Sequence, residues 1–143
     1  MDYSITSSTG EQKEGLRELE FVKVLTDNTT LTVADSGTVI AIATDAKTIT
    51  LPTIDAGNLG MEFTFINTGA DGAVKLNISP ASSDAIIGTI PNAAADSVSG
   101  GVVNKDFANT KATANKGDYV VLKALTLAGW YIVGGVGIWA SEA

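Results

Sequence analysis

The chain has 143 residues, 45% of them hydrophobic and 17% charged, with a net charge of −7 and neither cysteine nor histidine. This length fits one domain with its own hydrophobic core. The negative charge and the single arginine, Arg17, argue against a nucleic-acid partner, because lysine and arginine supply most of the affinity for phosphate backbones. The missing cysteine and histidine exclude disulfide bonds, thiolate nucleophiles and histidine-based catalysis.

Membrane association is also not expected. No run of the sequence approaches the roughly 18 apolar residues that a membrane-spanning helix needs. The first residues lack the basic start and the apolar stretch of a secretory signal. We therefore expect a protein that stays soluble where it is made.

Residues 1–20 differ in composition from the rest and are expected to form an extended N-terminal arm. Residues 3–10 are rich in serine and threonine, and residues 11–23 hold seven charged side chains of mixed sign. A plain disordered terminus is the alternative interpretation. If the arm binds a partner, Arg17 would pair with carboxylates across the contact, and the apolar anchors would be Tyr3, Ile5, Leu16, Leu19 and Phe21.

Residues 21–143 are expected to form one all-β domain. Apolar and β-branched residues alternate with small or polar ones over residues 38–43, 47–51, 61–66 and 74–78, which is typical of strands with one buried and one wet face. Further strands are expected at 84–88, 118–125 and 130–133. Clusters of Asn, Asp and Gly separate these segments and predict turns. Short strands with such turns indicate a single antiparallel β-sandwich or barrel, jelly-roll-like in type.

Two segments fit this pattern less well. Residues 88–116 read as a long excursion with small side chains, and loops of that length are usually functional or packed on a neighbour. The glycine-rich residues 134–140 have little side-chain bulk, so we expect them to pack closely against another backbone, from this chain or from a second subunit.

The triplet Asp35-Ser36-Gly37, preceded by Val33 and Ala34, is the candidate for catalysis. Aspartic proteases carry such a triplet after a hydrophobic pair, and two copies that meet at a dimer interface share a proton and activate water. The same triplet is also a common turn between strands. The turn is the favoured interpretation, and a dimeric aspartic protease acting through Asp35 is kept as the lowest alternative.

Three aromatic residues, Trp130, Tyr131 and Trp139, are candidates for a sugar-stacking platform. Alternation along residues 130–133 places Trp130 on the opposite face of the strand from Tyr131, so at least one face is more simply core. No motif for a metal ion or a cofactor occurs, and none is expected.

The order of the β-segments resembles that of β-rich virion proteins of tailed bacteriophages, namely head decoration (cement) proteins and short head or tail fibre domains. The resemblance spans most of the chain after the arm, in residues 29–37, 49–52, 63–69, 84–88, 117–122 and 129–133.

The resemblance implies a non-enzymatic structural protein that decorates and stabilises the capsid by binding the lattice of the major capsid protein as a homo-oligomer, commonly a homotrimer. Such a protein is made in the host cytoplasm and resides on the capsid surface of the virion. The alternative is a receptor- or carbohydrate-binding fibre domain. The short length and Met1 favour decoration, and decoration proteins often attach through a terminal arm such as residues 1–20.

Overall fold

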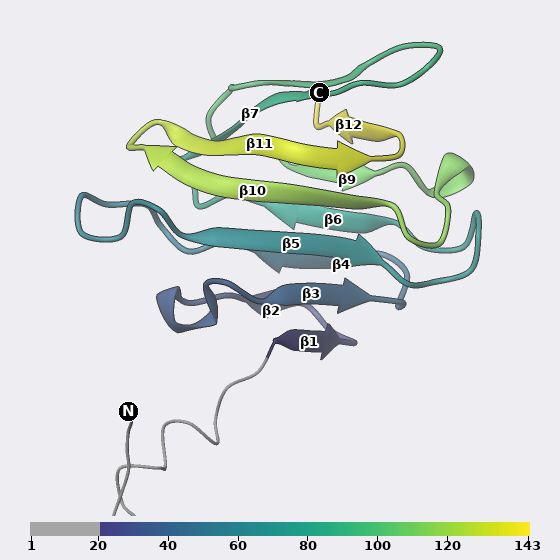
Figure 1. The fold of residues 1–143 in the computed structure, drawn as a ribbon, viewed down its shortest axis with the longest axis horizontal. Helices are drawn as coiled ribbons and strands as arrows, with labels where there is room; N and C mark the ends of the chain where they lie inside the picture. The colour runs from purple at the N-terminus through teal and green to yellow at the C-terminus, as the bar shows by residue number, and fades with distance from the viewer. Residues whose placement is uncertain (1–20) are drawn as a thin grey trace, which may run out of the picture.

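The computed structural model describes residues 21–143, which form two β-sheets packed face to face (Figure 1). In spatial order, the seven-stranded sheet holds β1 (Val22–Leu25), β3 (Val39–Ile42), β5 (Glu62–Asn67), β10 (Tyr119–Thr126), β11 (Gly129–Val136), β7 (Ala85–Ile90) and β8 (Ser97–Gly100). The five-stranded sheet holds β12 (Trp139–Ser141), β9 (Phe107–Asn109), β6 (Leu76–Ser79), β4 (Lys47–Thr50) and β2 (Thr29–Thr30). Two short 3₁₀ helices, η2 (Val33–Asp35) and η3 (Lys111–Thr113), lie between strands. The all-β sandwich expected from the sequence is confirmed.

The first six strands alternate between the two sheets. In the seven-stranded sheet β1, β3 and β5 pair in parallel, and in the five-stranded sheet β2, β4 and β6 do the same. Each connection therefore crosses the sandwich, and the chain winds around the core as in a β-solenoid. The expectation of wholly antiparallel pairing was wrong, since five of the ten strand pairs are parallel.

The second half of the chain completes both sheets. The hairpin of β10 and β11 joins β5 to β7 (Figure 1). Strand β8 pairs with β7 at the far edge of the same sheet. The segment 88–116, expected to be a long excursion, contains the second half of β7, all of β8 and β9, and η3. It is thus largely part of the sandwich.

Aromatic rings fill the space between the sheets. Phe63 and Phe65 of β5, Phe107 of β9 and Trp130 of β11 are fully buried. The ring centroids of Phe63 and Trp130 lie 5.6 Å apart at an interplanar angle of 47°. Tilted aromatic pairs of this kind stabilise a core beyond the effect of burial alone.

Three buried polar side chains tie the sheets together at one end. The Nδ2 of Asn67, on β5, donates to the Oδ1 of Asn109, on β9, at 2.8 Å. The Nδ2 of Asn109 donates in turn to the Oδ2 of Asp118 at 3.1 Å and to the carbonyl oxygen of Ile138 at 3.1 Å. Because each of these buried groups has partners, the network links the sheets without the cost of an orphaned polar atom.

Within the glycine-rich segment 134–140, Gly135 and Gly137 lie close to neighbouring segments of this chain, whereas Gly134 has open space where a Cβ would stand. Gly137 turns the backbone between β11 and β12 with φ of 107°, in the left-handed region that favours glycine. A Cβ atom at this position would fall on the carboxyl group of Asp118. The need for glycine at position 137 therefore follows from the turn and from the buried network.

Candidate functional site

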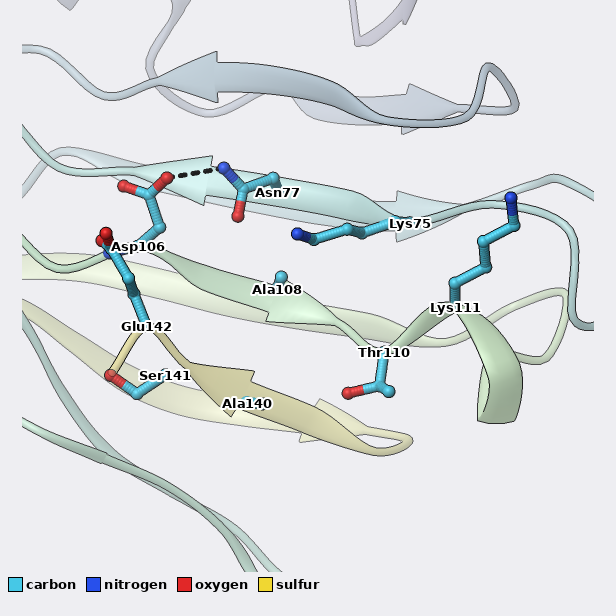
Figure 2. Close-up of a pocket in the computed structure, with 9 residues that line it drawn as sticks. All are labelled: Lys75, Asn77, Asp106, Ala108, Thr110, Lys111, Ala140, Ser141 and Glu142. Atoms are coloured by element: carbon cyan, nitrogen blue, oxygen red, sulfur yellow. Dashed lines mark hydrogen bonds between the residues drawn. The ribbon is translucent and has the colours of Figure 1, made fainter.

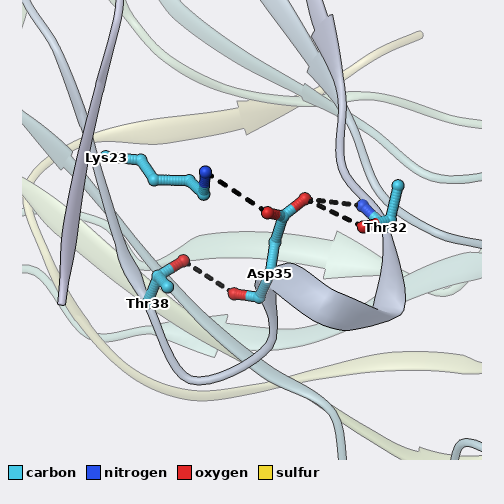
Figure 3. A network of polar contacts seen from close by, with 4 residues as sticks. All are labelled: Lys23, Thr32, Asp35 and Thr38. Carbon is cyan, nitrogen blue, oxygen red and sulfur yellow. Dashed lines mark hydrogen bonds and ion pairs between the residues drawn. The ribbon is translucent and has the colours of Figure 1, made fainter. Parts of the chain in front are cut away.

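Asp35 ends η2 and is held within its own turn (Figure 3). One carboxylate oxygen, Oδ2, accepts the backbone N–H of Thr32 at 2.8 Å and lies 3.2 Å from the Thr32 hydroxyl. The other oxygen, Oδ1, lies 3.4 Å from the Nζ of Lys23 on β1. The backbone carbonyl of Asp35 accepts the Thr38 hydroxyl at 2.7 Å. These bonds fasten the edge strand β1 and the start of β3 to one turn.

The surroundings of Asp35 favour the ionised form of its carboxyl group. Burial raises its pKa, but the hydrogen bond from Thr32 and the positive charge of Lys23 outweigh burial and hold the pKa below its usual range. These contacts give Asp35 a structural role in its turn, in agreement with the favoured interpretation.

The two tryptophans of the sugar-platform hypothesis are in the core. Trp130 has no exposed surface and Trp139 is 3% exposed. The Trp139 ring stacks on Phe107 with centroids 5.5 Å apart. The core interpretation of these two residues is confirmed, so neither ring face is open to a sugar, and Tyr131 alone is half-exposed.

A pocket lies on the outer face of the five-stranded sheet, over β6, β9 and β12 (Figure 2). Its volume is about 480 Å³. Ala108 of β9 pairs directly with Ala140 of β12, and these two residues form the floor of the pocket. Because both side chains are small, they leave a depression in the sheet surface. Polar and charged side chains surround that floor: Lys75, Asn77, Asp106, Thr110, Lys111, Ser141 and Glu142.

Charge divides this pocket into two ends. At one end the Nδ2 of Asn77 donates to the Oδ2 of Asp106 at 2.6 Å, and the backbone N–H of Asp106 donates to the Oε1 of Glu142 at 3.0 Å. At the other end the Nζ of Lys111 lies 2.6 Å from the Oδ2 of Asp45, and this hydrogen bond lowers the pKa of Asp45. The pocket therefore offers hydroxyl, amide, carboxylate and ammonium groups, which suit polar contacts to hydroxyl-rich or amide-rich ligands.

The sequence did not single out this pocket. Its residues come from strands far apart in the chain, and Asp106, Thr110 and Lys111 lie in the segment 88–116, which was expected to be a long excursion. The signal that could have found it is the pair of alanines, Ala108 and Ala140, at positions where outward-facing strand residues are usually larger.

Most of the predicted arm residues lie outside the described part of the chain: Tyr3, Ile5, Leu16, Arg17 and Leu19. Phe21 is described and immediately precedes β1, at one edge of the seven-stranded sheet. Its side chain is 74% exposed, so it has no place in the core of this subunit.

No family model matches this chain, and no curated protein is significantly similar to it. Within residues 21–143, no group of three or more Asp or Glu side chains is arranged to hold a metal ion. No helix in this part of the chain is long and apolar enough to cross a membrane.

Proposed function

We propose that this chain is a non-enzymatic virion protein that decorates and stabilises a bacteriophage capsid, binding the lattice of the major capsid protein as a homotrimer. Its place is the capsid surface of the virion, after synthesis in the host cytoplasm. Three weak contacts made together would hold far better than one, with no new chemistry.

The observation that carries this proposal is the two-sheet all-β sandwich, because it is the fold that the resemblance to phage virion proteins implies. Two further features agree with a structural role. The carboxylate of Asp35 forms hydrogen bonds within its turn and an ion pair. Near the pocket, the charge of Lys111 is paired with that of Asp45. In this proposal the arm, residues 1–20 with Phe21, is the element that attaches to the capsid.

The proposal is tested by co-sedimentation of the purified protein with heads of the phage that encodes it, stripped of this protein. We expect saturable binding with a fixed ratio of this chain to the major capsid protein, and heads that resist heating better when decorated. Serum albumin serves as the control for trapping. Protein that stays in the supernatant at every concentration would contradict the capsid-binding role.

The second candidate is a receptor- or carbohydrate-binding fibre domain. The polar pocket over β6, β9 and β12 favours it, because hydroxyl and amide groups around a small-residue floor can bind a sugar without an aromatic platform. A glycan panel separates the two candidates. Binding of one glycan class that Asn77→Ala abolishes, together with no binding to heads, would favour the fibre domain.

A further inference from the structure

The outer surface of the seven-stranded sheet is unusually apolar. The strand registers align its outward side chains in rows across the sheet. One row runs through Val22, Val39, Thr64, Val121 and Gly134. The next runs through Val24, Ala41, Ile66, Tyr119 and Val136. We call the surface that these two rows form the apolar face; its only side-chain polar groups are the hydroxyls of Thr64 and Tyr119.

Within the described part of the chain, the outer members of the apolar face are the most exposed, its central members are half-buried among their neighbours, and Ala41 is 6% exposed. Val22, Val24 and Val136 are 51%, 70% and 50% exposed. In Figure 1 the strands β3, β5, β10 and β11 lie in front of the five-stranded sheet, and no described segment crosses over them. Apolar patches of this extent on a soluble protein usually mark an interaction surface.

The opposite outer surface differs in chemistry. On the five-stranded sheet the register aligns Thr30, Thr50 and Ser79 in one row and Thr48 and Asn77 in the next. A sheet with one covered face normally alternates in this way between apolar and polar residues, whereas strands that are apolar on both sides are typical of sheets covered on both faces. The polar outer surface of the five-stranded sheet therefore suits contact with water, and the apolar outer surface of the seven-stranded sheet suits contact with a partner.

Charge indicates what kind of partner covers the apolar face. The chain carries a net charge of −7, so two copies repel one another wherever their carboxylates meet. The two rows of the apolar face hold no charged side chain, and the row beside them holds Glu62 opposite Lys123, whose Oε1 and Nζ lie 3.8 Å apart. A second copy can therefore pack here without bringing unpaired carboxylates together.

The extent of the face also suits a second copy. The two rows cross five strands about 4.8 Å apart and lie about 6.6 Å from one another, so the apolar face itself covers roughly 300 Å². The whole outer surface of the seven-stranded sheet, with the apolar face at its centre, covers roughly 500 Å². Two such sheet surfaces packed together would bury about 1,000 Å², which is the lower bound for a specific protein–protein interface.

We propose that copies of this chain associate through the apolar face. The proposal names the contact that would build the homotrimer of the proposed function, yet it depends on self-association alone, so it can hold where capsid binding fails. In a trimer each face would contact both neighbours around a threefold axis; in a dimer two faces would meet directly.

Two lysine substitutions of the same residue type test this surface. Thr64→Lys places a charge at the centre of the apolar face, between Val39 and Val121. Thr50→Lys places the same charge at the C-terminal end of β4, on the polar face of the other sheet. Both threonines are half-buried strand residues, and neither side chain makes a hydrogen bond within residues 21–143. The two substitutions should therefore lower the folding stability of a single subunit by similar amounts.

The measurement is sedimentation velocity of the full chain over a wide range of concentration, with far-ultraviolet circular dichroism to confirm folding. Wild type and Thr50→Lys should sediment as the same oligomer, and Thr64→Lys as a monomer with an unchanged spectrum. A second variant, Val22→Thr with Val24→Thr, removes apolar surface from two exposed positions outside the core and should weaken association about tenfold or more.

A wild type that is monomeric at every concentration would overturn the proposal, as would variants on the apolar face that associate as tightly as wild type. Loss of association in Thr50→Lys but not in Thr64→Lys would place the contact on the polar face instead. An oligomer that fails to bind heads would refute the capsid-binding role and leave the interface intact.

Discussion

Replacement of Asp35 by asparagine separates the structural interpretation of this residue from the catalytic one. The asparagine side chain keeps one oxygen that can accept the backbone N–H of Thr32, but it loses the charge that faces Lys23. A hydrogen bond to a charged acceptor is worth about 1 kcal/mol more than one to a neutral acceptor. The partly exposed ion pair adds between 0 and about 1 kcal/mol. We therefore expect Asp35→Asn to lower the free energy of unfolding by about 1 to 2 kcal/mol.

The pH dependence of the stability difference gives a second test of this prediction. The folded-state pKa of Asp35 is lowered, so its contribution to stability is complete above the unfolded-state pKa of about 3.9 and is lost as the pH falls through the folded-state value. The difference in stability between wild type and Asp35→Asn should be constant near neutral pH and shrink below about pH 4.

Urea denaturation followed by circular dichroism measures both quantities. Asp27→Asn is the matched control, because the Asp27 side chain is 84% exposed and its Oδ1 lies 3.7 Å from the Nζ of Lys47, so its removal should cost little. Head binding should be unchanged in Asp35→Asn. Unaltered stability, together with loss of a peptide-cleaving activity that the wild type possesses, would refute the structural interpretation.

Three further predictions concern the buried network, the tightest strand contact and the arm. Asn109→Ala removes the hydrogen bonds between the sheets and should cost about 2 to 4 kcal/mol in urea denaturation, since buried partners lose their donors and acceptors. Gly129→Ala would drive a Cβ into the backbone carbonyl of Ala85 on β7 and should cost about 2 kcal/mol or more, whereas Gly100→Ala meets nothing within 4 Å and should not. Deletion of residues 1–20 should leave a folded oligomer that sediments as before but no longer binds heads; undiminished binding would place the contact on the β-domain.

The positions of the strands could be predicted from the sequence, because a period of two records which residues face the core. Residues 47–51 were predicted as a strand, for example, and β4 is Lys47–Thr50. The same alternation placed Trp130 and Ile132 on one face, and Trp130 is in the core with Ile132 packed against it. Alternation reports burial, however, and it carries no information about which of two sheets a strand joins.

The partners of the strands could not be predicted for that reason. Short connections with turn residues suggested hairpins, but the two sheets of a sandwich lie about 10 Å apart, and four residues of extended chain reach across. Residues 43–46 make such a crossing between β3 and β4, and Ala46 assists with φ of 61°. Turn chemistry therefore marks a change of direction without saying whether the chain returns in the same sheet.

The buried network, the pocket and the apolar face could not be predicted either, because each of them depends on which strands are neighbours. Asn67 occurs in a sequence that is typical of a turn and Asp118 was predicted as the first residue of a strand, and both are buried next to Asn109, which is distant from Asn67 in the chain. The pocket and the apolar face likewise exist because registers align residues from several strands. Sequence reasoning could identify the turn at Asp35 because all of its hydrogen-bonding partners, Lys23 excepted, lie within three residues.

One sign of the apolar face was nevertheless present in the sequence. Residues 119–122 read Tyr-Val-Val-Leu, and a strand with one wet face would not place two valines side by side. Val120 is buried between the sheets, while Val121 lies on the apolar face. If self-association through that face supplies the avidity of the proposed function, a folded monomeric Thr64→Lys should bind heads about a hundredfold more weakly than wild type, although the arm is untouched. Equal head binding by the monomer would mean that a single arm suffices, and the trimer would then need another role.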